Sequence, residues 1–174
     1  MVFSNTYVKK TWYSDPLLFM IGGLVLSLDQ ITKLIVSTNL KLGESWPSEG
    51  IFRFTYATNT GSAFSLFQDR TLFLIVASFI AIVFLLYFYK IQSRPGLILR
   101  IAIGLQLGGA FGNLIDRIWR GAVIDFLDVG WWPIFNVADS SVVVGMIALV
   151  YVLLTGVGQN KTLDMKEESD NIDE

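Results

Sequence analysis

Long apolar runs are the feature that most restricts how this chain can fold. Two uncharged runs, 71–89 and 140–160, reach the about 20 residues that a helix needs to cross a bilayer. Two further runs, 16–38 and 100–115, reach membrane length only by including charged residues within them or at their ends. The sequence therefore predicts four spanning helices, near 16–37, 70–90, 97–116 and 138–157.

The composition agrees with a membrane setting. Apolar residues make up 53% of the 174 residues and charged residues only 16%, which is too little charge for a soluble domain of this length. Histidine and cysteine do not occur, which excludes disulfides, thiolate zinc sites and histidine bases. We expect one helical membrane domain over 16–157, a cytoplasmic segment over 1–15, and a disordered acidic cytoplasmic tail over 158–174.

The orientation in the membrane is predicted from helix number and positive charge. An even number of spans places both termini on one side, and the distribution of Lys and Arg weakly favours the cytoplasm for that side. The alternative for the first run is a cleaved signal peptide. However, no A-x-A-like site follows that run and Lys33 interrupts it, so a retained helix is favoured.

The two longer connections, about 39–69 and 117–137, then lie on the outer side. Alternating aromatic residues predict a strand over 51–56, and 121–127 and 131–135 are candidate partner strands. We expect a small β-sheet on the outer membrane surface. Four tryptophans are predicted to lie at the membrane interface: Trp46, Trp119, Trp131 and Trp132.

Two carboxylates, Asp125 and Asp139, flank the start of the last apolar run. An ionisable group at a bilayer edge costs free energy unless it is paired, hydrated or used in function. A pair of carboxylates suits peptide hydrolysis, because an ionised one can activate water while a protonated one donates to the carbonyl oxygen. The alternatives are that Asp139 is a helix N-cap and that Asp125 is an ordinary loop carboxylate.

Other polar residues also have two interpretations. Asp29 and Lys33 are spaced to pair on one helix face, either structurally or beside a substrate. Asn59, with Gly61 close behind, predicts a turn or a substrate contact. A further ambiguous feature is a stripe of small residues, which predicts either close helix packing or a substrate groove. The stripe consists of Gly104, Gly108 and Gly112.

Five motifs occur in the order and approximate spacing of the bacterial lipoprotein signal peptidases, also called signal peptidase II. They are DQITK at 29–33, NTGSAFS at 59–65, GGAFGNLIDR at 108–117, VIDF at 123–126 and FNVADS at 135–140. The resemblance covers 16–157 and implies an intramembrane aspartic endopeptidase with Asp125 and Asp139 as its catalytic dyad. Such an enzyme cuts the signal peptide of a prolipoprotein before a diacylglyceryl-modified cysteine.

The resemblance also implies residues that support the dyad or contact the substrate. Asp116 is left open between this role and anchoring the end of the third helix. The predicted set is Asp29, Lys33, Asn59, Gly61, Asn113, Asp116, Arg117 and Asn136. We expect no metal and no cofactor, prolipoproteins and membrane lipids as partners, a monomer, and the bacterial plasma membrane as the location.

Rival functions fit the sequence less well. A transporter or proton channel would place its charges near the midplane and often contains internal repeats, whereas 16–90 and 97–157 show no similarity to each other. A serine–lysine dyad of Ser27 and Lys33 would place the two side chains on different helix faces. Proteolysis by two aspartates is therefore the favoured function.

Overall fold

A computed structural model describes residues 13, 15–61, 71–92 and 95–156. The described residues form four helices, α1 (Pro16–Asn39), α2 (Thr71–Ile91), α3 (Leu97–Arg120) and α4 (Val137–Thr155), and three strands, β1 (Ser45–Trp46), β2 (Arg53–Asn59) and β3 (Val123–Asp128). All four helices are long and apolar enough to cross a membrane, which confirms the predicted spans. The predicted acidic tail, and the N-terminal segment except residues 13 and 15, lie outside the described residues.

The third helix is longer than the sequence predicted. It ends at Arg120, and Gly121 follows in the left-handed conformation with φ of 75°, which favours glycine because there is no Cβ to clash. Asp116 and Arg117 therefore lie within α3, one turn before its end. The extra turn contains Arg117 and Arg120, and Arg120 forms an ion pair with Asp116.

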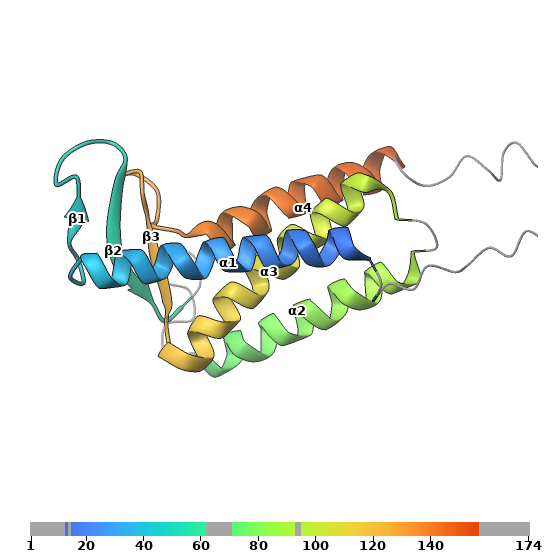
Figure 1. The fold of residues 1–174 in the computed structure, drawn as a ribbon, viewed down its shortest axis with the longest axis horizontal. Coiled ribbons are helices and arrows are strands. Elements are labelled where there is room, and N and C mark those ends of the chain that lie inside the picture. The colour runs from blue at the N-terminus through green and yellow to red at the C-terminus, as the bar shows by residue number, and fades with distance from the viewer. Residues whose placement is uncertain (1–12, 14, 62–70, 93–94, 157–174) are drawn as a thin grey trace, which may run out of the picture.

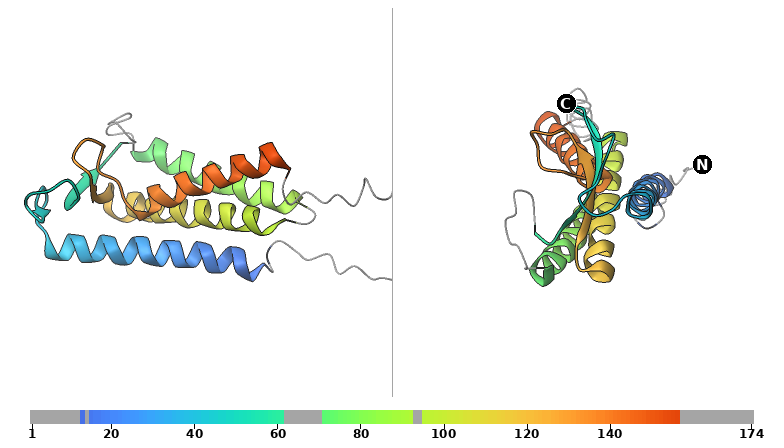
Figure 2. Two further views of the ribbon diagram at one scale, coloured as in Figure 1. Left: turned by 90° about the horizontal axis from the view of Figure 1, so that it is seen from above. Right: turned by 90° about the vertical axis from the view of Figure 1, so that its left-hand side faces the viewer.

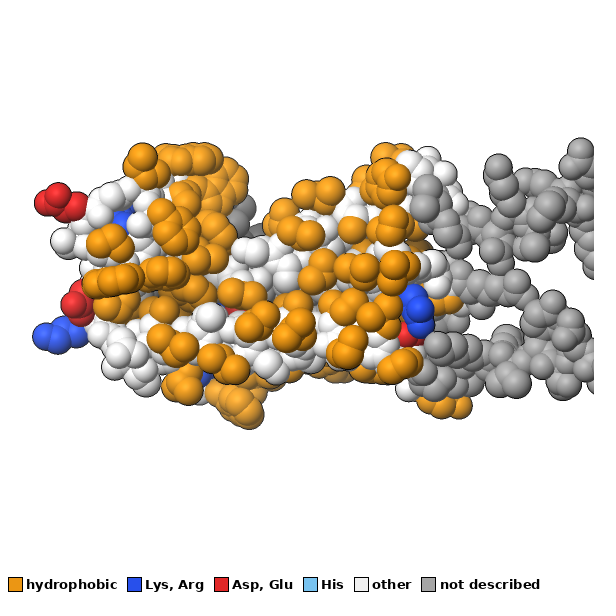
Figure 3. Space-filling model, turned by 45° about the horizontal axis from the view of Figure 1, so that its top comes forward, with side chains coloured by type: hydrophobic (Ala, Val, Ile, Leu, Met, Phe, Trp, Pro, Cys, Tyr) orange, Lys and Arg blue, Asp and Glu red, His pale blue; other side chains and the backbone are white. Residues whose placement is uncertain are grey.

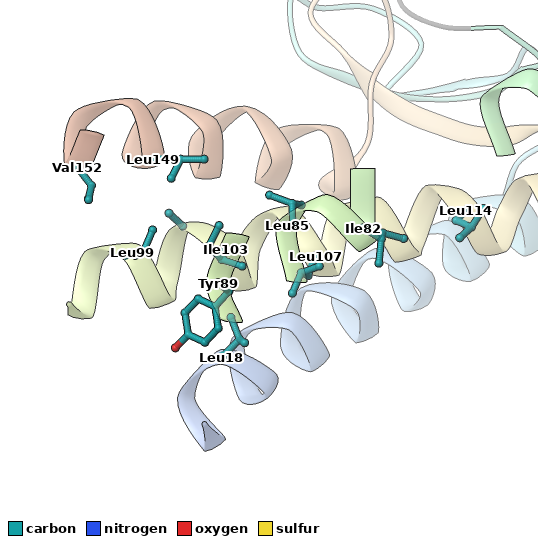
Figure 4. Close-up of a cluster of buried hydrophobic side chains, with 11 residues drawn as sticks. Leu18, Ile82, Leu85, Tyr89, Leu99, Ile103, Leu107, Leu114, Leu149 and Val152 are labelled. Carbon is teal, nitrogen blue, oxygen red and sulfur yellow. The ribbon is translucent and has the colours of Figure 1, made fainter. Parts of the chain in front are cut away.

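Helix α3 is the centre of the bundle and contacts the other three helices (Figures 1 and 2). A cluster of buried leucine, isoleucine and valine side chains, with Tyr89, joins the four helices away from the sheet (Figure 4). Leu18 comes from α1, Leu85 from α2, Ile103 from α3 and Leu149 from α4. Burying these side chains holds the bundle together at the end where α1 begins.

The outer faces of α1, α2 and α4 carry many exposed large apolar side chains. Figure 3 shows apolar side chains over most of the length of one face. Apolar surface of this extent would be unfavourable in water, but it matches the hydrocarbon core of a bilayer. The chain is therefore a multi-pass membrane protein.

A buried acid joins three helix ends far from the sheet. Asp15 caps α1 by accepting a hydrogen bond from the Leu18 amide at 3.4 Å. It also accepts two hydrogen bonds from Arg100, both at 2.7 Å, and one from the Tyr89 hydroxyl at 2.6 Å. Burial alone would raise the pKa of Asp15. The hydrogen bonds from Arg100 and Tyr89 outweigh this effect and lower the pKa to about 2.

The three strands form an antiparallel sheet in the order β1-β2-β3 at the opposite end of the bundle (Figure 1). Strands β2 and β3 confirm the predicted small sheet, with Ala57 opposite Asp125 and a register shift between Phe54 and Ala57. The predicted strand over 131–135 is wrong, because it contributes only an isolated bridge between Leu127 and Phe135. Proline in this segment cannot donate to a ladder, so pairing begins only near its end.

The predicted tryptophans are exposed, as an interfacial position requires. Their placement at the membrane surface stays a prediction. The four are Trp46, Trp119, Trp131 and Trp132.

The glycine stripe of α3 packs against α1 and opens no groove there. A Cβ added to Gly104 would lie 3.0 Å from the Ile21 side chain. One added to Gly108 would lie 2.6 Å from the Gly22 carbonyl oxygen and 2.7 Å from Val25 Cβ. The absence of side chains therefore allows the α1 and α3 backbones to approach closely.

We predict that Gly108→Ala lowers the thermal unfolding midpoint in detergent micelles. The added methyl group meets a backbone oxygen and a Cβ, neither of which can rotate away, so we expect a cost of about 1–3 kcal/mol. Gly23→Ala is the matched control, because no atom lies within 4 Å of its added Cβ. Equal midpoints for the two variants would contradict this packing.

Candidate active site

A buried lysine connects α1 to α3 at the sheet end of the bundle. Lys33 Nζ lies 2.8 Å from Asp29 Oδ2 and 2.7 Å from Asp116 Oδ2. It also donates to Asn113 Oδ1 at 3.0 Å. Asp116 forms a second ion pair with Arg120. The predicted pairing of Asp29 with Lys33 is confirmed, but the pair belongs to a larger cluster.

The charges of this cluster balance. Asp29, Lys33 and Asp116 are all 0% exposed, and a buried ion is tolerated only where opposite charge and hydrogen bonds replace its hydration. Two acids oppose two bases, and the Ile124 amide donates to Asp116 Oδ2 at 3.3 Å. We call Asp29, Lys33, Asp116 and Arg120 the ion cluster.

The ion cluster also determines where α4 begins. Asp29 Oδ1 accepts a hydrogen bond at 2.9 Å from the Ala138 amide, in the first turn of α4. Gln30 Nε2 donates to Asp29 Oδ2 at 3.1 Å and to the Gly112 carbonyl at 3.2 Å. A Cβ on Gly112 would lie 2.5 Å from Asp29 Oδ2, so only glycine leaves room for the carboxylate. Asp29 therefore joins α1 to both α3 and α4.

Asp139 lies in the first turn of α4 but is not the N-cap. Asn136 is the N-cap, and its Oδ1 accepts from the Asp139 amide at 2.8 Å. Asp139 Oδ2 accepts in return from the Asn136 amide at 3.3 Å, which completes a capping box. This reciprocal bonding corrects the alternative in which Asp139 itself caps the helix.

Asp125 and Asp139 are brought together by shared amide neighbours. Asn136 Nδ2 donates to Asp125 Oδ1 at 2.7 Å, while Asn113 Nδ2 donates to Asp139 Oδ1 at 2.8 Å. Asn136 Nδ2 also lies 3.2 Å from Asn113 Oδ1. Asn136 thus bonds both carboxylates, to Asp125 through its side chain and to Asp139 through its backbone.

Asn59 supplies the other donor to Asp125. Its Nδ2 donates to Asp125 Oδ2 at 3.1 Å, and its Oδ1 accepts from the Gly61 amide at 2.9 Å. The turn at Gly61 therefore directs the Asn59 amide group toward the acid. The predicted turn is present, while the predicted substrate contact of Asn59 stays a prediction. The rest of that motif, 62–65, lies outside the described residues.

Asp125 has an altered proton affinity. It is only 4% exposed, and burial followed by the negative charge of Asp139 raises its pKa to about 7. The hydrogen bonds from Asn59 and Asn136 offset part of this rise. At neutral pH, Asp125 is therefore able to hold a proton and also to release it.

Arg117 is the cation of the site outside the ion cluster. It donates to the Asn113 carbonyl at 3.5 Å, and its Nε has no hydrogen-bond partner among the described residues. Asp125 and Asp139 are close enough to act on it electrostatically. The guanidinium group thus lies within electrostatic range of the two carboxylates, and its Nε donor is available.

The sheet that carries Asp125 is held by a second acid on the same strand. Asp128 Oδ2 accepts from Arg53 at 2.8 Å and from the Thr55 hydroxyl at 2.8 Å, and its Oδ1 accepts from the Gly130 amide at 2.8 Å. Burial opposes ionisation, but these donors lower the pKa of Asp128 below its usual value. Asp128 stabilises the pairing of β2 with β3 and takes no part in the carboxylate pair.

Two residues of the site were missed from sequence. Gln30 bonds Asp29, and Arg120 neutralises Asp116. Arg120 is four residues after Asp116, the spacing of a helical ion pair, so extending the third helix to 120 would have found it. Gln30 has no comparable signal beyond its position next to Asp29.

Four membrane-crossing helices with paired carboxylates at one end define a membrane-embedded enzyme. A family model described as "Signal peptidase (SPase) II" matches residues 21–155. The chain therefore belongs to the signal peptidase II family. It is a membrane protease that processes lipoprotein precursors.

The chain is similar in sequence to its relatives along most of their length. The lipoprotein signal peptidase of Moorella thermoacetica is 45% identical over 78% of this chain and 91% of its own. That of Staphylococcus aureus is 34% identical over 84% of this chain and 93% of its own. A solved bacterial membrane enzyme matches with a TM-score of 0.76 and 33% identity, over 83% of this chain and 92% of that one.

Proposed function

We propose that Asp125 and Asp139 hydrolyse the peptide bond that precedes the lipid-modified cysteine of a prolipoprotein. The bonding of both carboxylates by the single residue Asn136 carries this proposal. Amide groups of Asn59 and Asn113 approach the carboxylates from the other sides. The arrangement holds two acids at one place in a site that also contains a cation, Arg117.

The reaction needs one proton on the carboxylate pair. Ionised Asp139 takes a proton from water as the water oxygen attacks the carbonyl carbon, and Asp125 gives its proton to the carbonyl oxygen. The tetrahedral intermediate then collapses to the carboxylic acid. As the carbon–nitrogen bond breaks, the nitrogen takes the proton from Asp139, and the hydroxyl proton of the intermediate returns to Asp125.

The surroundings support this assignment of the proton. Asp139 lies in the first turn of α4, and each of its two carboxylate oxygens accepts a hydrogen bond, one from Asn113 and one from the Asn136 amide. The raised pKa of Asp125, about 7, allows it to keep a proton. Arg117 balances the remaining negative charge because the ion cluster is already neutral.

We propose that the reaction uses no metal and no cofactor. The nearby carboxylates Asp29 and Asp116 are occupied by Lys33, so they are not available as ligands for a hard cation. Activity that is lost on chelation and restored by a divalent metal would contradict this.

We propose that the chain ends face the cytoplasm of a bacterial plasma membrane and that the site faces outward. The sheet and the start of α4 lie at the end of the bundle opposite to where α1 begins and α4 ends (Figure 1). Asp125 belongs to β3 of this sheet and Asp139 to the first turn of α4. The outer placement suits a substrate that has been exported. Its partners are prolipoproteins and surrounding lipids, and it acts as a monomer.

Cysteine labelling tests this orientation. Ser48 lies at the sheet end and Lys90 at the other end, and both residues are exposed. We expect Ser48→Cys, but not Lys90→Cys, to react with an impermeant thiol reagent in intact cells. The native chain has no cysteine to obscure the result. Labelling of Lys90→Cys alone would invert the orientation.

We predict that Asp125→Asn and Asp139→Asn each reduce cleavage of a lipid-modified precursor by at least about 100-fold. Each substitution removes a titrating group and changes little volume. The measurement is the gel mobility shift of the precursor, with folding checked by size-exclusion elution. Asp128→Asn is the matched control on the same strand, and cleavage per folded molecule should persist. Near-normal cleavage by either dyad variant would remove that residue from the mechanism.

We predict that kcat/KM is bell-shaped in pH and falls as pH rises through about 7, the value to which the pKa of Asp125 is raised. Above this pH the pair loses the proton that must be donated to the carbonyl oxygen. Asn59→Ala removes a donor that lowers this pKa, so the descending limb should move to higher pH. A limb that stays in place would show that another group titrates there.

A further inference from the structure

Gln106 presents a buried amide that the fold does not use. It lies on α3 within the membrane-spanning bundle and is 3% exposed, and its Nε2 has no hydrogen-bond partner. Among the described residues, the only other buried side-chain atom without a partner is Arg117 Nε. Both atoms are donors. No bulk water reaches a bilayer core, so an unpaired donor is unfavourable unless something else pairs with it.

The helical repeat places Gln106 in line with the active site. Asn113 and Arg117 follow it by seven and eleven residues, which puts each of them within about 20° of Gln106 around α3. Asn113 bonds Asp139, and Arg117 lies within electrostatic range of both carboxylates. The face that contains Gln106 therefore leads from the bundle interior to the site. Gln106 lies about 10 Å below Asn113 along the helix.

Close packing holds the stem of Gln106 in place. A Cβ on Gly145 of α4 would lie 2.8 Å from Gln106 Cγ and 2.7 Å from the Ala102 carbonyl oxygen. The stem is thus held between α3 and α4, but the Nε2 atom at its end lacks a partner among the described residues.

A signal-peptide substrate contains hydrogen-bond acceptors of the kind that Gln106 Nε2 lacks. The last four carbonyls of any helix have no partner within that helix, and a peptide must be unwound at the bond to be cut. In hydrocarbon, each unpaired carbonyl costs free energy. An extended chain advances about 3.3 Å per residue, so about 10 Å corresponds to roughly three residues ahead of the scissile bond.

We propose that the Gln106 amide donates a hydrogen bond to a main-chain carbonyl of the signal peptide, about three residues ahead of the scissile bond. The position of this contact rests on the proposed dyad. Gln106 is thus a substrate-binding residue inside the membrane. It pairs a carbonyl that unwinding leaves free, without regard to side-chain identity.

Replacing Gln106 with methionine, an apolar side chain of similar length, separates hydrogen bonding to substrate from packing. Gln106→Met should raise KM for the lipid-modified precursor by about 3- to 10-fold, the effect of one neutral hydrogen bond, with kcat changed less than about twofold. Its thermal unfolding midpoint should be unchanged or higher, because a buried unpaired amide has been removed. Leu99→Met, two turns earlier on α3, is the packing control and should leave KM unchanged.

Two results would overturn the proposal. One is an unchanged KM in Gln106→Met. The other is a lower unfolding midpoint together with a kcat loss, which would show that Gln106 acts only in packing between α3 and α4.

Cross-linking locates the contact. Gln106→Cys is combined with Asp125→Asn, and precursors carry single cysteines at successive positions ahead of the scissile bond. Disulfide formation should be greatest near the third position, whereas absence of a maximum would overturn the contact. Cleavage by the Asp125→Asn background would refute the dyad instead, so the two failures are distinguishable.

Discussion

The burial of Lys33 is the constraint on which the rest of the structure depends. A cation in an apolar bundle is stable only if acids meet it at the same depth, and these come from α1 and α3. Meeting this requirement determines the rotation and height of α1 relative to α3. The glycines of α3 allow the approach, because a side chain at Gly108 would meet the α1 backbone and one at Gly112 would meet Asp29.

The ion cluster then positions the groups of the proposed dyad. Asp29 bonds the first turn of α4, and Lys33 occupies Asn113 Oδ1, so that Asn113 Nδ2 is directed to Asp139. A chain of amides and carboxylates extends from the cluster to the proposed dyad. Low polarity strengthens every link in such a network. The same burial raises the pKa of Asp125, so the environment that requires the cluster also prepares the acid.

The sheet supplies one of the two acids, Asp125, and its neighbour Asn59. Asp125 and Asn59 lie on paired strands, and Asp128 holds those strands together through Arg53 and Thr55. Almost every buried polar side-chain atom of the described residues has a partner. The two exceptions, on Gln106 and Arg117, are both donors on the face of α3 that leads to the site. A fold optimised only for stability would pair or remove them, which is why we assign the Gln106 amide to substrate.

Helix number and membrane setting follow from the sequence, because span length and helical periodicity are local properties. The sequence left the glycine stripe open between close packing and a groove, and the structure decided for packing. The resemblance of ordered motifs also indicated the site residues. Tertiary structure alone decided that Lys33 bridges two acids, that Asn136 rather than Asp139 caps α4, and that 131–135 forms no strand. Lys33 and Asp116 are far apart in sequence, and their pairing depends on how α1 and α3 pack. Local pattern carries no information about such distant contacts, because the free energy that selects them arises only when the helices meet.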